Sequence, residues 1–219
     1  MPPGAISAFE KYSVLLEEKG KNTNLTAIKG EDDTVRFHFL DSLALLGIYG
    51  FKEKSVIDVG SGAGFPGVPV KIAEPSVDLT LIDSTGKKVA FLIELCNTLS
   101  IKAECIHARA EDALTGQNMR ERYDIAVSRA VARLNVLCEI CLPFVDIGGT
   151  FLAMKGSAVK DELIEAHNAI ETLGGKILDR IDYKIPGTDI IRSIVLITKT
   201  SATPVQYPRR FSKIRSKPL

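Results

Sequence analysis

The stretch of sequence that decides the fold runs from Val56 to Gly67 and reads Val-Ile-Asp-Val-Gly-Ser-Gly-Ala-Gly-Phe-Pro-Gly. Its first four residues are a mostly apolar run typical of a buried strand, and its last eight contain four glycines. Glycine lets the backbone turn sharply and approach a ligand, because no Cβ stands in the way. Pro66 suits the first turn of a helix, where its missing N–H costs nothing. The stretch therefore predicts a strand, a tight ligand-binding loop and a helix N-terminus in succession.

Short apolar runs recur at near-regular intervals along the rest of the chain. The predicted strands are Ser55–Val59, Leu79–Asp83, Glu104–His107, Asp124–Ser128, Thr150–Lys155, Ile177–Tyr183 and Ser193–Thr198. Helical patterns lie between most of them, as in residues 87–99 and 161–173, and two earlier helices are predicted over residues 4–20 and 34–49. Strands that alternate with helices predict a parallel sheet with helices on both faces.

The last two predicted strands are connected differently. A turn at Pro186 and Gly187 joins them without a helix, so they pair as an antiparallel hairpin. We therefore predict an α/β protein with a mostly parallel seven-stranded sheet, a C-terminal antiparallel hairpin and an N-terminal helical cap. The predicted domains are the cap over residues 1–50, a main domain over 51–200 and a basic tail over 201–219.

The composition is that of an ordinary globular protein. Of the 219 residues, 45% are hydrophobic and 25% charged, which excludes disorder, collagen and coiled coil as descriptions of the whole chain. The longest nearly unbroken apolar run, residues 43–51, is far shorter than the ~20 residues that cross a membrane. The first residues lack the basic start and apolar core of a secretory signal. With only four cysteines, we predict a cytoplasmic protein with reduced thiols and no membrane partner.

The charge is unevenly distributed along the chain. No acidic residue follows Asp189, whereas seven cationic residues do: Arg192, Lys199, Arg209, Arg210, Lys213, Arg215 and Lys217. An acidic body with a basic end predicts that this end binds a polyanion. The alternative is a solvated tail that keeps the protein soluble.

Two cofactors fit the glycine loop. Read from Gly62, the sequence GAGFPG matches the dinucleotide pattern, whereas GSGAG, read from Gly60, is a pattern of S-adenosylmethionine (SAM) sites. The first glycine should follow the strand directly, as Gly60 does, which favours SAM. Asp83 ends the next predicted strand, 23 residues beyond Gly60, where a carboxylate accepts hydrogen bonds from the hydroxyls of a ribose. A purely structural turn with a capping aspartate is the alternative.

The segment Arg109-Ala110-Glu111-Asp112 follows the third predicted strand. In this architecture the segment lies beside an adenine, to which Ala110 would offer a backbone contact and Glu111 an acceptor for the amino group. A helix N-terminus that favours acidic residues is the alternative interpretation.

The end of the fourth predicted strand bears on the chemistry. Ser128-Arg129-Ala130 stands where amino-group methylases of adenine carry an N/D-P-P-Y box, and the chain has neither that box nor the Pro-Cys pair of cytosine carbon methylases. The three histidines form no triad-like pattern with a nucleophile. A site without a general base suits guanine N7, which has a lone pair and no proton to remove, so that alignment alone drives the transfer.

Cys138 and Cys141 have the spacing of a redox or metal pair. They lie on an apolar helical stretch and no second ligand pair exists, so we predict two buried cysteines and no metal site.

The chain resembles the RsmG, or GidB, family of bacterial small-subunit ribosomal RNA guanine-N7 methyltransferases. The resemblance covers nearly the whole chain in order. Its segments are Asn24-Leu25-Thr26, His38 to Leu43, Asp58 to Gly67, Leu81 to Ser84 with Lys87-Lys88 and Phe91-Leu92, Arg109 to Glu111, Ser128 to Ala130, Gly148-Gly149 through Lys155-Gly156, and Tyr207 to Arg209. The glycine string with Phe-Pro-Gly and the His-x-x-Asp-Ser-Leu segment are the most specific. One departure is the tail, which lacks the family's Gly-x-Pro stretch.

The resemblance implies a class I SAM-dependent methyltransferase fold and methylation of N7 of one guanine in 16S ribosomal RNA. It implies that Gly60, Phe65, Ala110, Glu111 and Arg129 contact the cofactor, with Asp83 on the ribose. We also predict that Gly62 of the same loop binds the cofactor, and that Arg129 is catalytic because it stands where cofactor and target meet. The residues predicted to bind RNA are Arg209, Arg210, Lys213, Arg215 and Lys217. We expect a monomer, and we expect removal of residues 209–219 to leave SAM affinity unchanged, because the cofactor loops lie within residues 58–133.

Two alternatives remain at this point. A nicotinamide-dependent oxidoreductase is favoured only by GAGFPG and lacks room for a substrate domain. A non-catalytic RNA-binding ribosome assembly factor with a vestigial cofactor site differs from the enzyme only in activity.

Overall fold

The computed structural model describes residues 1–219 except 24, 27, 29, 117–118, 130–131 and 157–158. Asn24 and Ala130, which belong to the motifs quoted above, lie outside the described residues.

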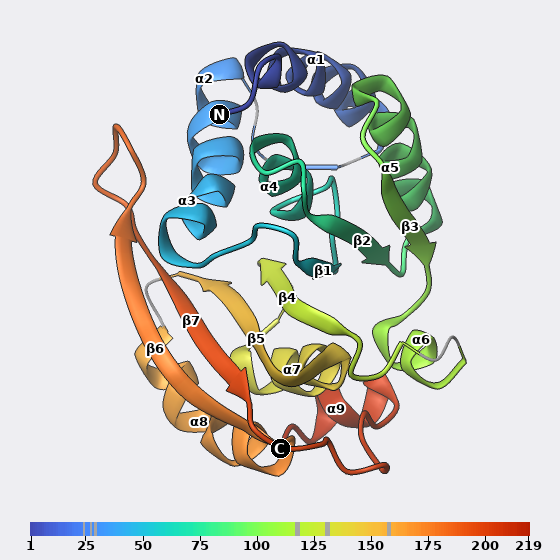
Figure 1. Ribbon diagram of the computed structural model, residues 1–219, viewed down its shortest axis with the longest axis vertical. Helices are drawn as coiled ribbons and strands as arrows, with labels where there is room; N and C mark the ends of the chain where they lie inside the picture. The colour runs from blue at the N-terminus through green and yellow to red at the C-terminus, as the bar shows by residue number, and fades with distance from the viewer. Residues whose placement is uncertain (24, 27, 29, 117–118, 130–131, 157–158) are drawn as a thin grey trace.

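A seven-stranded sheet runs through the molecule in the order β3-β2-β1-β4-β5-β7-β6 (Figure 1). The strands are β1 (Ser55–Val59), β2 (Asp78–Asp83), β3 (Ala103–His107), β4 (Tyr123–Arg129), β5 (Val145–Lys155), β6 (Gly175–Lys184) and β7 (Ile191–Lys199). The first five pair in parallel, and β7 pairs antiparallel with both β5 and β6. The predicted parallel sheet and closing hairpin are therefore confirmed, and all seven strands are found.

Helices cover both faces of the sheet, as Figure 1 shows. One layer holds α1 (Ala5–Thr23), α2 (Glu31–Thr34), α3 (Asp41–Ile48), α4 (Gly67–Ala73) and α5 (Gly86–Leu99), with a π-helical turn over Val35–Leu40. The other layer holds α6 (Ala110–Gly116), α7 (Leu134–Cys141), α8 (Val159–Thr172) and α9 (Phe211–Ser216), with a 3-10 turn over Leu142–Phe144.

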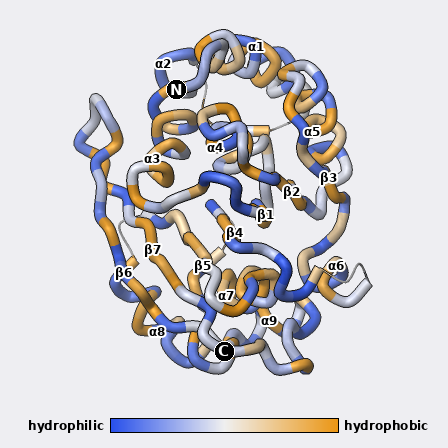
Figure 2. Tube along the Cα trace, viewed as in Figure 1, coloured by the Kyte–Doolittle hydropathy of each residue, from blue (hydrophilic) through white to orange (hydrophobic). Residues whose placement is uncertain are grey.

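The alternation of side chains along each strand divides the core into two halves. On β1, Val56 belongs to the cluster under α1, α4 and α5, whereas its neighbour Ile57 belongs to the cluster under α7 and α8. Figure 2 shows hydrophobic residues recurring along β5, β7 and α7, whose side chains are mostly buried. Both faces are thus packed, as a sheet of this kind requires.

The first 50 residues are part of this packing. Tyr12 of α1 is fully buried, and its hydroxyl donates a hydrogen bond to the carbonyl of Ala63 in the glycine loop. The helix predicted over residues 34–49 is continuous from residue 31 to 48, apart from the change to π-helical geometry. The N-terminal helices therefore support the loop that follows β1.

Candidate cofactor site

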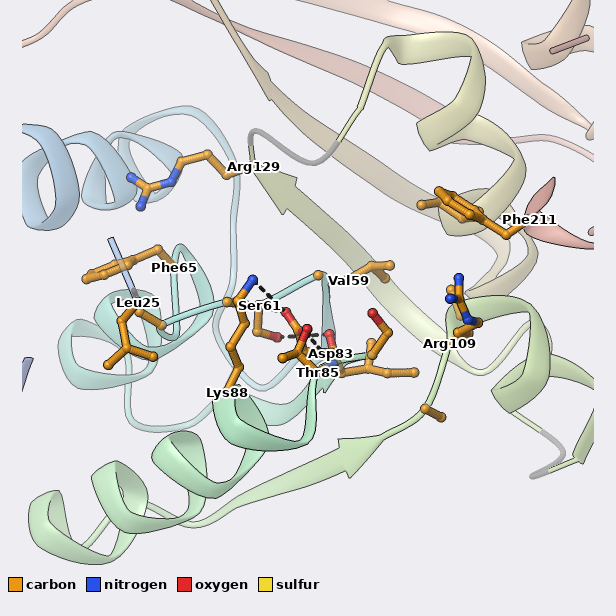
Figure 3. A pocket seen from close by; sticks show the side chains of 18 of the residues that line it. Leu25, Val59, Ser61, Phe65, Asp83, Thr85, Lys88, Arg109, Arg129 and Phe211 are labelled. Carbon is orange, nitrogen blue, oxygen red and sulfur yellow. Dashed lines mark hydrogen bonds and ion pairs between the residues drawn. The ribbon is translucent and has the colours of Figure 1, made fainter. Parts of the chain in front are cut away.

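A cavity of about 420 Å³ opens at the carboxyl ends of β1, β2, β3 and β4. All seven residues predicted to hold a cofactor line it: Gly60, Gly62, Phe65, Asp83, Ala110, Glu111 and Arg129. Figure 3 shows Arg129 and Phe65 at one end, Phe211 and Arg109 at the other, and Asp83 between them. The cavity is therefore elongated, with a cationic and aromatic group at each end.

The glycine loop has the backbone that its sequence predicts. Gly60, Gly62 and Gly64 have φ angles of +75°, +59° and +99°, which favour glycine. A Cβ at Gly64 would lie 2.6 Å from the Tyr12 hydroxyl, so this glycine lets the loop rest on α1. The helix begins at Gly67, and Pro66, predicted to lie in its first turn, is the residue just before it. The Gly67 N–H donates to Asp58 Oδ2 at 2.8 Å.

Asp83 connects the ends of β1 and β2. Its Oδ2 accepts a hydrogen bond from the Gly62 N–H at 3.0 Å, and its Oδ1 accepts one from the Thr85 N–H at 2.8 Å. Lys88 lies 3.8 Å from Oδ2. A carboxylate has about four lone-pair positions, so each oxygen can accept one further bond from a ligand.

Three stacked rings form one end of the cavity. Phe65 lies between Tyr12 and His38, with ring centroids at 5.1 Å and 4.3 Å and nearly parallel planes. The Arg129 guanidinium lies 4.9 Å from the Phe65 ring centre, within cation–π range.

Three groups position Arg129, which ends β4. Nη1 donates to Asp41 Oδ2 at 2.9 Å and to the Phe37 carbonyl at 3.1 Å, and Nη2 donates to His38 Nδ1 at 2.9 Å. The Arg129 and Asp41 side chains are 13% and 4% exposed, so this ion pair is largely shielded from solvent. Arg129 is thus a cavity residue and a member of a buried ion pair.

His38 is held as the neutral imidazole. Because Nδ1 accepts from Arg129, the proton is on Nε2, which donates to Thr26 Oγ1 at 2.7 Å. Burial, and then the neighbouring Arg129 charge, lower the pKa of His38 to about 3. His38 therefore has no free lone pair to act as a general base.

The other end of the cavity is built by α6 and the C-terminal segment. Phe211 lines it, its ring lies 5.7 Å from the Arg109 guanidinium carbon, and its N–H donates to Glu111 Oε1 at 3.3 Å. The expectation that the segment lies apart from the cofactor loops therefore needs correction. Residues after 208 contribute part of the cavity wall.

Arg209 is the anchor of this segment. It donates from Nε to Glu139 Oε1 at 2.8 Å, and the Glu139 side chain on α7 is fully buried. Ile214 is also fully buried, in the hydrophobic cluster that includes the apolar residues of α7. Of the five residues predicted to bind RNA, Arg209 is thus occupied by a buried carboxylate. The other four, Arg210, Lys213, Arg215 and Lys217, are exposed.

The charge at the end of the chain is also partly neutralised within the fold. The buried Lys199 ammonium lies 3.0 Å from Glu121, and burial lowers its pKa. Lys199 and Arg209 therefore stabilise the fold, and the surface charge of this region is smaller than the sequence indicates.

Cys138 and Cys141 are fully buried, as predicted, and burial raises the pKa of both thiols. Within the described part of the chain, no group of three or more His, Cys, Asp or Glu side chains is placed to hold a metal. No described helix is both long and apolar enough to cross a membrane.

Sequence reasoning missed several residues of the cavity. They are Leu25, Thr26, His38, Lys88, Ile140 and Phe211. Leu25, Thr26 and His38 stand in the Asn-Leu-Thr and His-x-x-Asp-Ser-Leu segments that carried the resemblance. The family resemblance therefore pointed to these three residues. Phe211 had no such signal.

These features define the class of the protein. An antiparallel β7 between β5 and β6, a glycine loop after β1 and an acidic residue ending β2 make it a class I SAM-dependent methyltransferase. A nicotinamide fold would instead have strand order 3-2-1-4-5-6. The family model GidB, described as rRNA small subunit methyltransferase G, matches residues 5–184, and the chain belongs to this family.

Individual relatives agree with that assignment. The chain is 46% identical to the ribosomal RNA small subunit methyltransferase G of Alkaliphilus oremlandii over 98% of its own length and 90% of the relative's. Among solved structures, it is similar to a SAM-dependent methyltransferase from Aquifex aeolicus, with a TM-score of 0.58, 17% identity and coverage of 76% and 94%. It is also similar to M. jannaschii TYW2 in complex with AdoMet, with a TM-score of 0.57, 12% identity and coverage of 79% of each chain. At these identities the two structures support the fold alone.

Proposed function

We propose that this protein transfers the methyl group of SAM to N7 of a guanine in small-subunit (16S) ribosomal RNA. The observation that carries the proposal is the single cavity lined by all seven residues predicted for the cofactor. The family and the names of the relatives supply the RNA class.

The shape and polarity of the cavity fit SAM. Asp83 offers acceptors for ribose hydroxyls at the middle of the cavity, and Phe211, at the end shared with Ala110 and Glu111, offers an aromatic surface for the adenine. At the opposite end, the Arg129 guanidinium offers a partner for the methionine carboxylate. The loop backbone at Gly62 has a positive φ, which lets it turn close to the ligand without a side chain.

The residues at the Arg129 end suit a reaction without proton transfer. When bound, SAM supplies a methyl group on a sulfonium; transfer to the N7 lone pair breaks the carbon–sulfur bond, leaves that electron pair on sulfur and releases no proton. His38 holds Arg129 and has no lone pair to offer. Catalysis by this chain therefore rests on alignment of the two reactants.

Exposed cations near the cavity provide a surface for the RNA. Arg210, Lys213, Arg215 and Lys217 lie on or beside α9, the helix that begins with Phe211. Because ribosomal RNA is the proposed substrate, we infer that the reaction takes place in the cytoplasm. We also infer that the protein is a monomer in which the tail of residues 201–219 acts with the main domain.

The test combines binding and transfer. SAM should bind by calorimetry while NAD should not, and tritium from methyl-labelled SAM should enter 16S RNA or the small subunit. Binding of NAD but not SAM would indicate a nicotinamide-dependent oxidoreductase instead. Binding of SAM and RNA without transfer would favour the assembly factor.

A further inference from the structure

A second cavity, of about 250 Å³, adjoins the first and shares His38 and Arg129 with it. It lies at the carboxyl ends of β4 and β5, the latter ending in Lys155. Its polar lining also includes Glu162 of α8 and Arg192 of β7, together with Asp41 and Tyr183, which bond each other. The shared wall is at the end of the first cavity where we place the methionine part of SAM. A group in the second cavity would thus face the methyl donor.

Glu162 offers this cavity one open acceptor. Its Oε2 accepts from Lys155 Nζ at 2.6 Å and from the Leu134 N–H at 2.7 Å. Its Oε1 has no hydrogen-bond partner among the residues that the structure describes. The Glu162 and Lys155 side chains are only 12% and 7% exposed, so the contact between them is largely shielded from solvent and holds the carboxyl group in place.

Arg192 offers the cavity an unsatisfied donor. Its Nε is buried without a hydrogen-bond partner, and its guanidinium forms no ion pair with any side chain in the described part of the chain. A buried donor without a partner destabilises a fold, and the guanidinium to which it belongs lines this cavity, so a ligand bound there can supply an acceptor.

We propose that this second cavity receives the target guanine and that Glu162 selects guanine through its Watson–Crick edge. The inference rests on the proposed function. With N7 directed at the shared wall, the opposite edge of the base carries the N1–H and 2-amino donors toward the Glu162 carboxylate. Arg192 donates to O6, the one acceptor on that side of the ring system. A charged acceptor and a buried donor thus match the donor and acceptor groups of guanine.

The same groups reject adenine. Adenine has no 2-amino group, and its N1 lone pair would face the Glu162 carboxylate without a proton between them. A site built to hydrogen-bond a substrate discriminates strongly against an analogue that lacks the donor. Entry into this cavity also requires an unpaired base, so the target guanine is one that leaves its stack or lies in a single-stranded loop.

The test replaces one group of the base and one group of the protein. The full-length protein is given SAM and two small-subunit RNAs, which carry guanine or inosine at the target position. Inosine keeps N7, O6 and N1–H and lacks only the 2-amino group. The wild type should methylate the inosine RNA about 10- to 100-fold more slowly, as expected for one lost hydrogen bond to a charged group. In Glu162→Gln, transfer to the guanine RNA should fall and the guanine-to-inosine ratio should approach one.

Two further variants make the result specific. Glu165→Gln changes a carboxylate on the same helix whose ion pair with Arg133 is solvent-exposed, and it should leave both rates unchanged. Arg192→Gln should slow both RNAs equally, because both carry O6, and so should keep the wild-type ratio. The SAM affinity of all three variants should match that of the wild type, since none of these residues lines the first cavity.

Each outcome decides the proposal. A wild type that methylates both RNAs equally, or a Glu162→Gln variant that keeps the full ratio, overturns it. If Glu162→Gln does not fold, the wild-type ratio and the Arg192→Gln rates still decide. An Arg192→Gln variant that loses RNA affinity but keeps its turnover would show that Arg192 binds a backbone phosphate, which overturns the base pocket. No transfer to the guanine RNA at all would instead reject the proposed function itself.

Discussion

Arg129 lies between the two cavities and holds together groups from distant parts of the chain. It bonds Asp41, which in turn accepts a hydrogen bond from the Tyr183 hydroxyl at 2.7 Å on β6. Removing the guanidinium would leave the Asp41 carboxylate buried with one neutral partner. Arg129→Ala would therefore remove the partner of a buried carboxylate as well as a residue of the cavity wall.

We predict that Arg129→Ala lowers the free energy of unfolding by about 3 kcal/mol, because it leaves a charge buried and unpaired. Arg133→Ala is the matched control: its pair with Glu165 is exposed on both sides and should contribute far less to stability. Urea denaturation measures both values. Equal, small losses would show that the Arg129–Asp41 pair contributes little to the fold.

Asp83→Asn isolates the charge on the proposed ribose contact. The variant keeps an acceptor for a loop N–H but presents a neutral group to the hydroxyls, so we expect SAM to bind about 10- to 100-fold more weakly. Calorimetry gives the affinity, and Asp112→Asn, an exposed change on α6, serves as the control. SAM affinity equal to that of the wild type would remove Asp83 from the ribose site.

Asp58 makes stability depend on pH. It is fully buried, one of its oxygens has no partner, and burial raises the pKa of its carboxyl to about 7. Between pH ~4, the unfolded pKa, and pH ~7 the folded chain keeps a proton that the unfolded chain has lost, so this group lowers stability as pH rises. The stabilisation of Asp58→Asn relative to wild type should therefore grow from pH 4 to 7 and then level off. A difference in melting temperature between Asp58→Asn and wild type that stays constant from pH 4 to 7 would exclude the raised pKa of Asp58.

At the scale of elements, the C-terminal segment is the part of the molecule that sequence reasoning placed least well. Arg209 and Glu139 are 70 positions apart, and no periodicity or motif connects them. Phe211 reaches the cavity only because this pair and Ile214 fix the segment on α7. Such contacts form between residues far apart in the sequence, so they cannot be predicted from the pattern of neighbouring residues alone.

We predict that deleting residues 209–219 weakens SAM binding, because it removes the Phe211 wall, and destabilises the fold by leaving Glu139 buried and unpaired. The single change Phe211→Ala should weaken SAM binding by about 1–2 kcal/mol with little effect on melting temperature. Adding Glu139→Gln to the truncated chain should restore part of the lost stability. A truncated chain with wild-type melting and wild-type SAM affinity would contradict the observed packing.

The regular elements were predictable for a physical reason. The strands β1, β2, β4 and β7 are mostly buried, so their apolar runs are visible without knowledge of their partners, and the predicted end of β1 at Val59 is the observed one. The glycine loop was visible because positive φ angles demand glycine. His38 and Lys88 stand in segments that carried the resemblance, but no role was predicted for them, because a histidine or a lysine on a helix has many other uses.

At the scale of the whole molecule, four exposed cationic residues of the tail remain available to bind a polyanion. Replacing Arg210, Lys213, Arg215 and Lys217 together by glutamine keeps Arg209, Phe211 and Ile214 and so should keep the fold. If about three of the four touch phosphates, the slope of log affinity for RNA against log salt should flatten by about 2. A salt titration of RNA binding measures the slope, with SAM calorimetry as the control. Identical slopes would mean that RNA contacts another face.

The central claim is the identity of the methylated atom, and chemical mapping of the product tests it most directly. The wild-type protein is incubated with SAM and small-subunit RNA or subunits that lack the modification, and the RNA is then treated with borohydride and aniline, which cleave the chain at N7-methylguanine. We predict one strong cleavage position, at a guanine, that appears only when both SAM and the protein are present. Methyl incorporation without cleavage, or nucleosides methylated at an atom other than guanine N7, would contradict it.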